Sequence, residues 1–170
     1  MPKMLSDGDD LLLWVPDGGI DDVSAPTVDE LTAVGVLNIS CLVTKANFQL
    51  GASGDASIDD PALCSAGSSA APGITSYQAG MDFYRWTVTT EDKAWTTFTG
   101  KGLGGFLVHR IGKKHDVAIA AADPVAVYGA ITGTPTPLQP DAQGGFRKFH
   151  QDFFVQGEQV DERAVVAAGS

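Results

Sequence analysis

The side chains of this sequence that could bind a metal or act as nucleophiles include three histidines and two cysteines. His109, His115 and His150 do not have the spacing of metal ligands, and neither Cys41 nor Cys64 has a nearby partner in a short ligand motif. Structural zinc sites take four closely grouped nitrogen or sulfur ligands, usually from motifs such as C-x-x-C and H-x-x-x-H. The sequence therefore predicts no metal site, and two reduced cysteines in the core or in loops.

Two pairs of neighbouring carboxylates, Asp21–Asp22 and Asp59–Asp60, are the candidates for acid–base catalysis. A catalytic acid needs a pKa raised by apolar surroundings, and both pairs lie in stretches poor in large apolar residues. The glycine-rich run 100–105 leaves an expected helix and enters an expected strand, whereas a phosphate-binding loop leads into a helix. No serine stands in a G-x-S-x-G elbow. We therefore expect no enzyme, no catalytic residue and no cofactor.

The stretch FRKFHQDFFVQG combines phenylalanines with charged side chains and a histidine. Because side chains alternate along a strand, Phe149 and Phe153 fall on one face, and Lys148, His150 and Asp152 fall on the other. One apolar and one polar face are typical of a strand that lies between a core and water. This pattern predicts a half-buried antiparallel strand without any chemistry.

The rest of the chain must supply the elements that position these side chains. A capping box at Thr27 and Glu30 predicts a helix of one turn through about Val34, and Thr89 with two following acids predicts a second, more substantial helix. Runs rich in β-branched and aromatic residues predict strands at Leu11–Val15, Val36–Leu50, Ile74–Val88, Phe106–Ile111, Val117–Ala120, Val125–Thr132 and in the extended run 163–168. The predicted fold class is mainly β, a β-barrel or β-sandwich with one flanking α-helix and long loops.

The segment 51–73 consists mostly of glycine, alanine, serine and proline, with almost no large apolar residue. Such a composition cannot build a core, and loops of this length are uncommon inside a compact domain unless they are functional or disordered. We expect a single domain over residues 1–170, with a long loop at 51–73 and extended terminal segments.

The net charge of the chain is −10, and residues 1–63 carry −9 of it, with eleven acidic and two basic side chains. Proteins grip nucleic-acid phosphates with Lys and Arg, so this balance argues against tight nucleic-acid binding. No apolar run approaches the ~20 residues that cross a bilayer, and the amino terminus lacks the layout of a signal peptide. We expect a soluble protein that is made in a cytoplasm and does not act at a membrane.

Six segments, in this order along the chain, carry a family resemblance: PKMLSDGDDLLLWVP, SAPTVDEL, IDDPALCS, KAWTTFTGKGLGGFLVHRIG, DPVAVYGAITG and KFHQDFFVQGEQVDERAVVAAG. Together they resemble the major tail tube proteins of long-tailed, siphovirus-type bacteriophages of actinobacterial hosts. The resemblance implies a structural protein of the virion tail, assembled in the host cytoplasm, with no active site and no cofactor. It implies that six copies close into a ring and that rings stack into a hollow tube, which conducts the genome into the host.

The same resemblance implies the partners. They are further copies of the chain, the tape measure, the tail terminator and the distal tail protein, while double-stranded DNA passes through without specific binding. Because a lumen lined with carboxylates would repel DNA phosphates, we expect some acidic residues there, with Asp82 and Asp152 as candidates. We expect the loop 51–73 to become ordered against the next ring, through Asp55, Ile58, Asp59, Asp60 and Leu63.

Two other classes of protein fit the same residues. One is another ring component of a virion, such as a tail terminator or a head decoration protein; a terminator forms a single ring that does not stack. The other is a small-ligand-binding β-barrel of the lipocalin type, which would need an apolar cavity inside the monomer.

Overall fold

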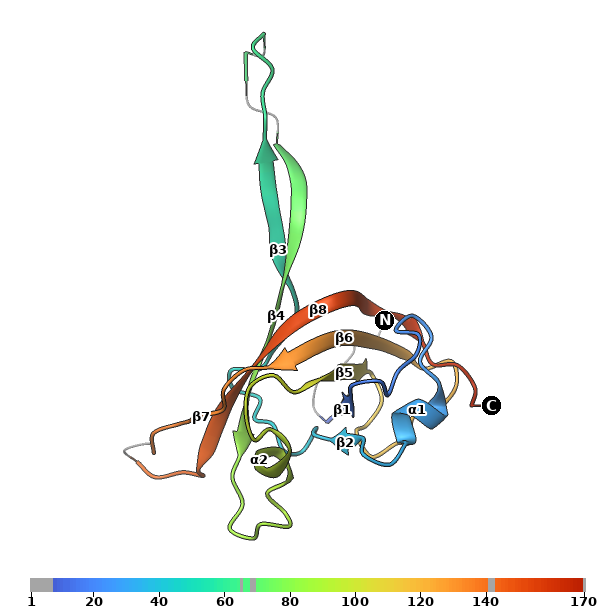
Figure 1. Cartoon of the computed structure of the whole chain (residues 1–170), viewed down its shortest axis with the longest axis vertical. Coiled ribbons are helices and arrows are strands. Elements are labelled where there is room, and N and C mark those ends of the chain that lie inside the picture. The colour runs from blue at the N-terminus through green and yellow to red at the C-terminus, as the bar shows by residue number, and fades with distance from the viewer. Residues whose placement is uncertain (1–7, 65, 68–69, 141–142, 170) are drawn as a thin grey trace, which may run out of the picture.

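A computed structural model describes residues 8–64, 66–67, 70–140 and 143–169 of the chain. The helices and strands, in chain order, are β1 (Asp10–Pro16), α1 (Val28–Thr32), β2 (Leu37–Asn38), β3 (Gln49–Asp59), β4 (Ala70–Tyr84), α2 (Lys93–Thr97), β5 (Gly104–Ile111), β6 (Pro124–Thr132), β7 (Thr136–Pro137) and β8 (Lys148–Val165). The prediction of a mainly β protein with little helix is confirmed (Figure 1).

The strands form one antiparallel sheet in the order β2-β1-β5-β6-β8-β4-β3, and β7 pairs with β8 beside this path. Strand β8 lies between β6 and β4, because its first residues pair with β4 and the rest of the strand pairs with β6. Within the described residues the sheet does not close, so it is an open curved sheet where the sequence predicted a barrel or a sandwich (Figure 1). Its two edges are therefore available for pairing with other chains.

Both faces of the sheet around β1 are covered by packed side chains, which explains the unbroken apolar run of β1. Leu12 and Trp14 belong to a cluster with Phe83, Phe149 and residues of α2, whereas Leu13 and its neighbours on the opposite face pack with residues of α1. A strand that is buried on both sides reads as a continuous hydrophobic run instead of an alternating one. The half-buried strand predicted from FRKFHQDFFVQG is confirmed, because Phe149 and Phe153 are buried in β8.

The prediction of the first helix is confirmed, and the prediction of the second helix needs correction. The capping box is confirmed: Glu30 N donates to Thr27 Oγ1 at 3.2 Å, and Thr27 N donates to Glu30 Oε2 at 2.7 Å. The second helix does not begin after Thr89, because α2 follows Asp92 and spans only one turn and a half. The described residues therefore contain two short helices, and the second is shorter than predicted.

Two predicted strands are mostly absent because side chains take over the backbone hydrogen bonds. In the segment 36–50, Ser40 Oγ accepts from Leu12 N at 2.8 Å, so the chain turns away after β2 instead of extending along β1. Residues 117–120 form no strand, because the carbonyls of Val117 and Ala118 accept hydrogen bonds from the Arg110 guanidinium.

The expectation of a structureless loop at 51–73 is wrong over the strands that the structure describes there. Strands β3 and β4 pair from Gln49↔Gly80 to Asp59↔Ala70, and this hairpin projects far from the rest of the sheet (Figure 1). Pairing satisfies the backbone without large side chains, so a segment of small residues can form strands outside any core. We call residues 49–78 the arm.

Candidate functional site

The arm presents acidic and apolar side chains to solvent. Between Lys45 and Arg85 the sequence contains no basic residue and four aspartates, three of them in the arm. The residues predicted to contact another ring all lie exposed on the arm, and they are Asp55, Ile58, Asp59, Asp60 and Leu63. Large apolar side chains exposed on an isolated hairpin do not stabilise the monomer, and such surfaces mark interaction sites, so this surface is suited to a partner.

The arm is attached to the sheet by a carboxylate between two tyrosines. Asp161 of β8 accepts from the Tyr128 hydroxyl at 2.5 Å and from the Tyr77 hydroxyl at 3.2 Å. Burial and the neighbouring negative charge of Asp161 raise the pKa of Tyr77, so its hydroxyl stays protonated as the donor. Sequence reasoning missed this contact because Tyr77 and Asp161 are 84 positions apart.

The two candidate lumen residues lie on either side of one histidine. His150 Nδ1 lies 2.6 Å from Asp82 Oδ1, and His150 Nε2 lies 3.0 Å from Asp152 Oδ1. Asn47 Nδ2 donates to the other oxygen of Asp82 at 2.9 Å. We call these four residues the His150 clamp. It ties β4 and β8 to the segment that leads into the arm.

The electrostatics of the clamp favour a protonated ring. A neutral imidazole has one N–H, so only the imidazolium can donate to both carboxylates. Burial lowers the pKa of His150, but the hydrogen bonds and charges of Asp82 and Asp152 outweigh it and raise that pKa above its usual value. The Asp82 side chain is only 5% exposed and that of Asp152 is 63% exposed, so Asp152 is the member that solvent or a passing ligand meets.

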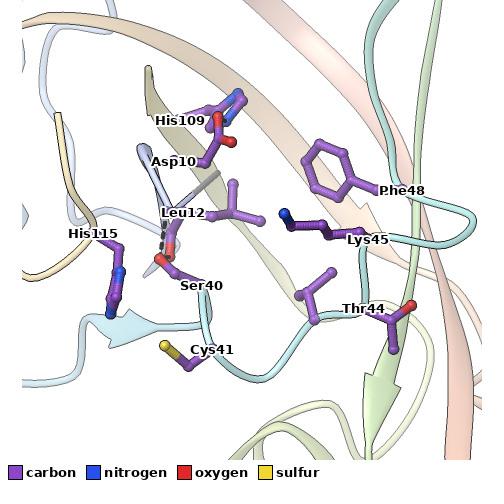
Figure 2. A pocket seen from close by; sticks show the side chains of 11 residues that line it. Asp10, Leu12, Ser40, Cys41, Thr44, Lys45, Phe48, His109 and His115 are labelled. Atoms are coloured by element: carbon purple, nitrogen blue, oxygen red, sulfur yellow. Dashed lines mark hydrogen bonds and ion pairs between the residues drawn. The ribbon is translucent and has the colours of Figure 1, made fainter. Parts of the chain in front are cut away.

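A cavity of about 460 Å³ lies between strands β1 and β5 and the segment that precedes the arm (Figure 2). Leu12, Val43 and Phe48 give it apolar walls, Lys45 adds a cationic group and His115 adds an imidazole ring. The side chains lining it also include Asp10, Ser40, Cys41, Thr44 and His109. Sequence reasoning did not group these residues, because they come from strands and loops that are distant along the chain.

The polar groups of the cavity are largely committed to each other or to the backbone. His109 Nε2 lies 3.0 Å from Asp10 Oδ1, and the Phe48 ring packs edge-on against the His109 ring. Ser40 Oγ bonds the backbone of Leu12 and not a histidine, so it has no base to activate it. The arrangement is suited to receiving a side chain or a small group and not to covalent chemistry.

The cysteines and histidines do not gather into a metal centre in the described part of the chain. Cys41 and Cys64 are free and exposed, in the cavity wall and near the end of the arm. No cluster of three or more potential ligands occurs among the residues with described positions. In the same residues, no helix is long and apolar enough to span a bilayer.

A family model described as "Phage tail tube protein" matches residues 1–169. No curated protein matches the sequence. The family match covers nearly the whole chain, and a mainly β subunit with an exposed hairpin is consistent with assembly into a larger structure. This chain belongs to the phage tail tube protein family.

Proposed function

We propose that six copies of this chain close into a ring and that the rings stack into the tube of a long-tailed phage. Family membership makes the chain a structural subunit of a virion tail. The observation that carries the ring proposal is the open sheet, whose terminal strands β2 and β3 leave backbone groups for pairing with another copy. A head-to-tail contact between different surfaces closes into a ring or continues as a stack.

The finer assignments rest on the sequence resemblance. The tail is of the siphovirus type, the host is an actinobacterium, and the subunits are made and assembled in the host cytoplasm. The partners beyond the chain itself are the tape measure, the tail terminator and the distal tail protein. The protein performs no catalysis and holds no cofactor; its function is to enclose double-stranded DNA without binding it specifically.

We infer that the arm makes contacts between rings and that the clamp region faces the lumen. The exposed acidic and apolar residues of the arm support the first assignment. The exposed carboxylate of Asp152 supports the second, with Asp82 acting from beneath as the group that holds His150. With a protonated His150, the two carboxylates and the imidazolium together carry a net charge of about −1, which repels phosphate.

Electron microscopy of the purified protein across a concentration series tests the proposal. We expect rings and tubes to appear as concentration rises. A terminator-like protein would give single rings that never stack. Monomers at every concentration, including in the presence of tail initiator proteins, would contradict the proposed function.

An arm-shortened variant separates stacking from folding. The pair Gly54↔Ser76 allows residues 55–75 to be replaced by Asn-Gly, which forms a tight hairpin turn between these partners. The removed residues are outside both core clusters, so thermal unfolding should be nearly unchanged. We expect this variant to stop tube growth. Full-length tubes from the shortened protein would remove the arm from the stacking contact.

A further inference from the structure

We propose that the cavity of Figure 2 receives the end of the arm of a neighbouring copy, residues 58–63. This inference rests on the proposed function, because it names the two surfaces that meet when subunits associate. The occupant is a second copy of this chain.

The chemistry of the two surfaces is complementary. The end of the arm places Asp59 and Asp60 between the exposed side chains of Ile58 and Leu63. The cavity has apolar walls together with the ammonium group of Lys45 and the imidazole rings of His109 and His115. Among the described lining residues the acidic group is Asp10, which lies 3.0 Å from His109 Nε2. An apolar anchor combined with an opposite charge gives both affinity and register.

The size and position of the surfaces fit a contact between copies. A cavity of about 460 Å³ is in the range of pockets that hold groups of several side chains. The arm points away from the sheet, so its end cannot reach the cavity of its own chain (Figure 1). Each copy therefore offers one arm and one cavity, and such a head-to-tail contact repeats without limit or closes into a ring.

The two cysteines of the chain report on this contact. Cys41 lines the cavity, and Cys64 directly follows Leu63 at the end of the arm. Both thiols are exposed and free. When the arm end of one copy enters the cavity of the next, Cys64 and Cys41 of two different chains come close together.

Cross-linking of assembled wild-type protein tests the contact directly. Bis-maleimides of a short and a long spacer are added to tubes; each thiolate adds across a maleimide double bond, which then takes up a proton, so no oxidant is required. We expect a ladder of multimers on a denaturing gel and a peptide that joins Cys41 to Cys64. In Cys41→Ser and in Cys64→Ser protein, the peptide that joins Cys41 to Cys64 and the ladder should both be absent. Tubes that give no Cys41–Cys64 product with either spacer would overturn this inference and leave the proposed function standing.

A pair of matched substitutions gives a second measurement. Leu63→Glu places a carboxylate where an apolar side chain enters the cavity, and Val34→Glu makes a similar change at an equally exposed residue of the body. We expect Leu63→Glu to raise the critical concentration for tube formation by roughly tenfold or more, because it removes the apolar burial of Leu63 and places a charge against the apolar walls. Val34→Glu should leave that concentration almost unchanged. Equal effects of the two substitutions would contradict the docking of Leu63, whereas wild-type protein that never assembles would contradict the proposed function itself.

Discussion

At the scale of single residues, the structure concentrates its buried polar contacts in a few side chains that join distant segments. The His150 clamp joins the end of β4, the start of β8 and the segment before the arm. Arg110 does the same for the β5–β6 connection, where its guanidinium bonds several backbone carbonyls and the Asp123 carboxylate. Buried charges of this kind are stable only with their partners in place, so their removal has measurable costs.

The His150 clamp predicts a pH dependence of stability. Because the folded-state pKa of His150 is raised, its contribution is fully present below the unfolded pKa of about 6.5 and is lost as pH rises through the folded pKa. Comparing urea unfolding of wild type and His150→Gln from pH 5 to 9 should show a difference of about 1.5 kcal/mol at low pH that shrinks at high pH. This difference is at the low end of what hydrogen bonds to charged groups contribute, because the His150 side chain is 30% exposed. A pH-independent difference would exclude protonation as the source.

The Asp123 site predicts a larger loss of stability than the His150 clamp, with the opposite dependence on pH. Arg110 and Asp123 are both almost fully buried and lie 3.2 Å apart, so Asp123→Asn leaves a buried guanidinium without its counter-charge. We expect a loss of about 3–5 kcal/mol in the free energy of unfolding near pH 7. Lys113→Ala is the control, because Lys113 contacts the same carboxylate but is half exposed and should cost less than about 1 kcal/mol.

The change in the free energy of unfolding at acidic pH tests the same site. Burial alone would raise the pKa of Asp123. The hydrogen bonds and charge of Lys113, the Ala120 amide and Arg110 outweigh burial and hold that pKa below its ordinary value of 3.8. Its contribution is therefore present above that value and is lost only as pH falls through the lowered pKa. A wild-type advantage over Asp123→Asn that disappears already at pH 6 would contradict this assignment.

At the scale of elements, the close approach of β5 to β1 depends on one glycine. A Cβ at Gly105 would lie 2.5 Å from Trp14 Cζ2 and 2.5 Å from the Val15 carbonyl oxygen, whereas a Cβ at Gly104 would meet nothing closer than 3.6 Å. Trp14 is in the centre of one core cluster, where it packs against Phe98 and Phe153. The register of β1 and β5 thus places the tryptophan ring over a position without a side chain.

The two adjacent glycines form a matched pair of substitutions. Gly105→Ala should lower the free energy of unfolding by about 1–3 kcal/mol, because the added methyl overpacks a rigid ring and a backbone atom. Gly104→Ala should change it by less than about 1 kcal/mol. Urea unfolding followed by tryptophan fluorescence measures both. Similar stabilities of the two variants would show that β1 and β5 separate easily, against the packing described here.

At the scale of the whole molecule, the sheet and the arm leave strand edges and apolar side chains exposed, where other chains can pair and pack. The open sheet has two edges, and the arm exposes Ile58, Leu63 and Ile74. The assembled ring would multiply each lumen charge by the number of subunits. The lumen proposal is therefore a statement about the whole tube, and it is tested by DNA passage.

We predict that Asp152→Lys slows DNA ejection in low salt. Six lysines facing DNA would attract phosphates over a distance near the Debye length, about 8 Å at physiological ionic strength, and added salt should restore the rate. Asp152→Ala removes the same bond to His150 without adding positive charge, so it controls for damage to the clamp. Ejection is measured from phages whose tubes are intact by microscopy. Unchanged ejection in low salt by Asp152→Lys would remove Asp152 from the lumen.

The sequence by itself determined the mainly β character, the strand of Leu11–Val15, the capping box at Thr27 and the alternation of β8. These features depend on neighbours within a few positions, where periodicity and side-chain capping act directly. The assignment to tail tube proteins also came from ordered segments of the sequence, and the family match over residues 1–169 confirms that part of it.

Only the tertiary structure decided the arm, the open sheet and the composition of the clamp and the cavity. The arm is stranded because β3 and β4 satisfy each other's backbone groups, although their small side chains gave no hydrophobic signal. Asp82 was expected to face a lumen, yet pairing of β4 with β8 buries it against His150, 68 positions away in sequence. Local patterns contain no information about such partners, because strand order and register bring them together only when the whole sheet is formed.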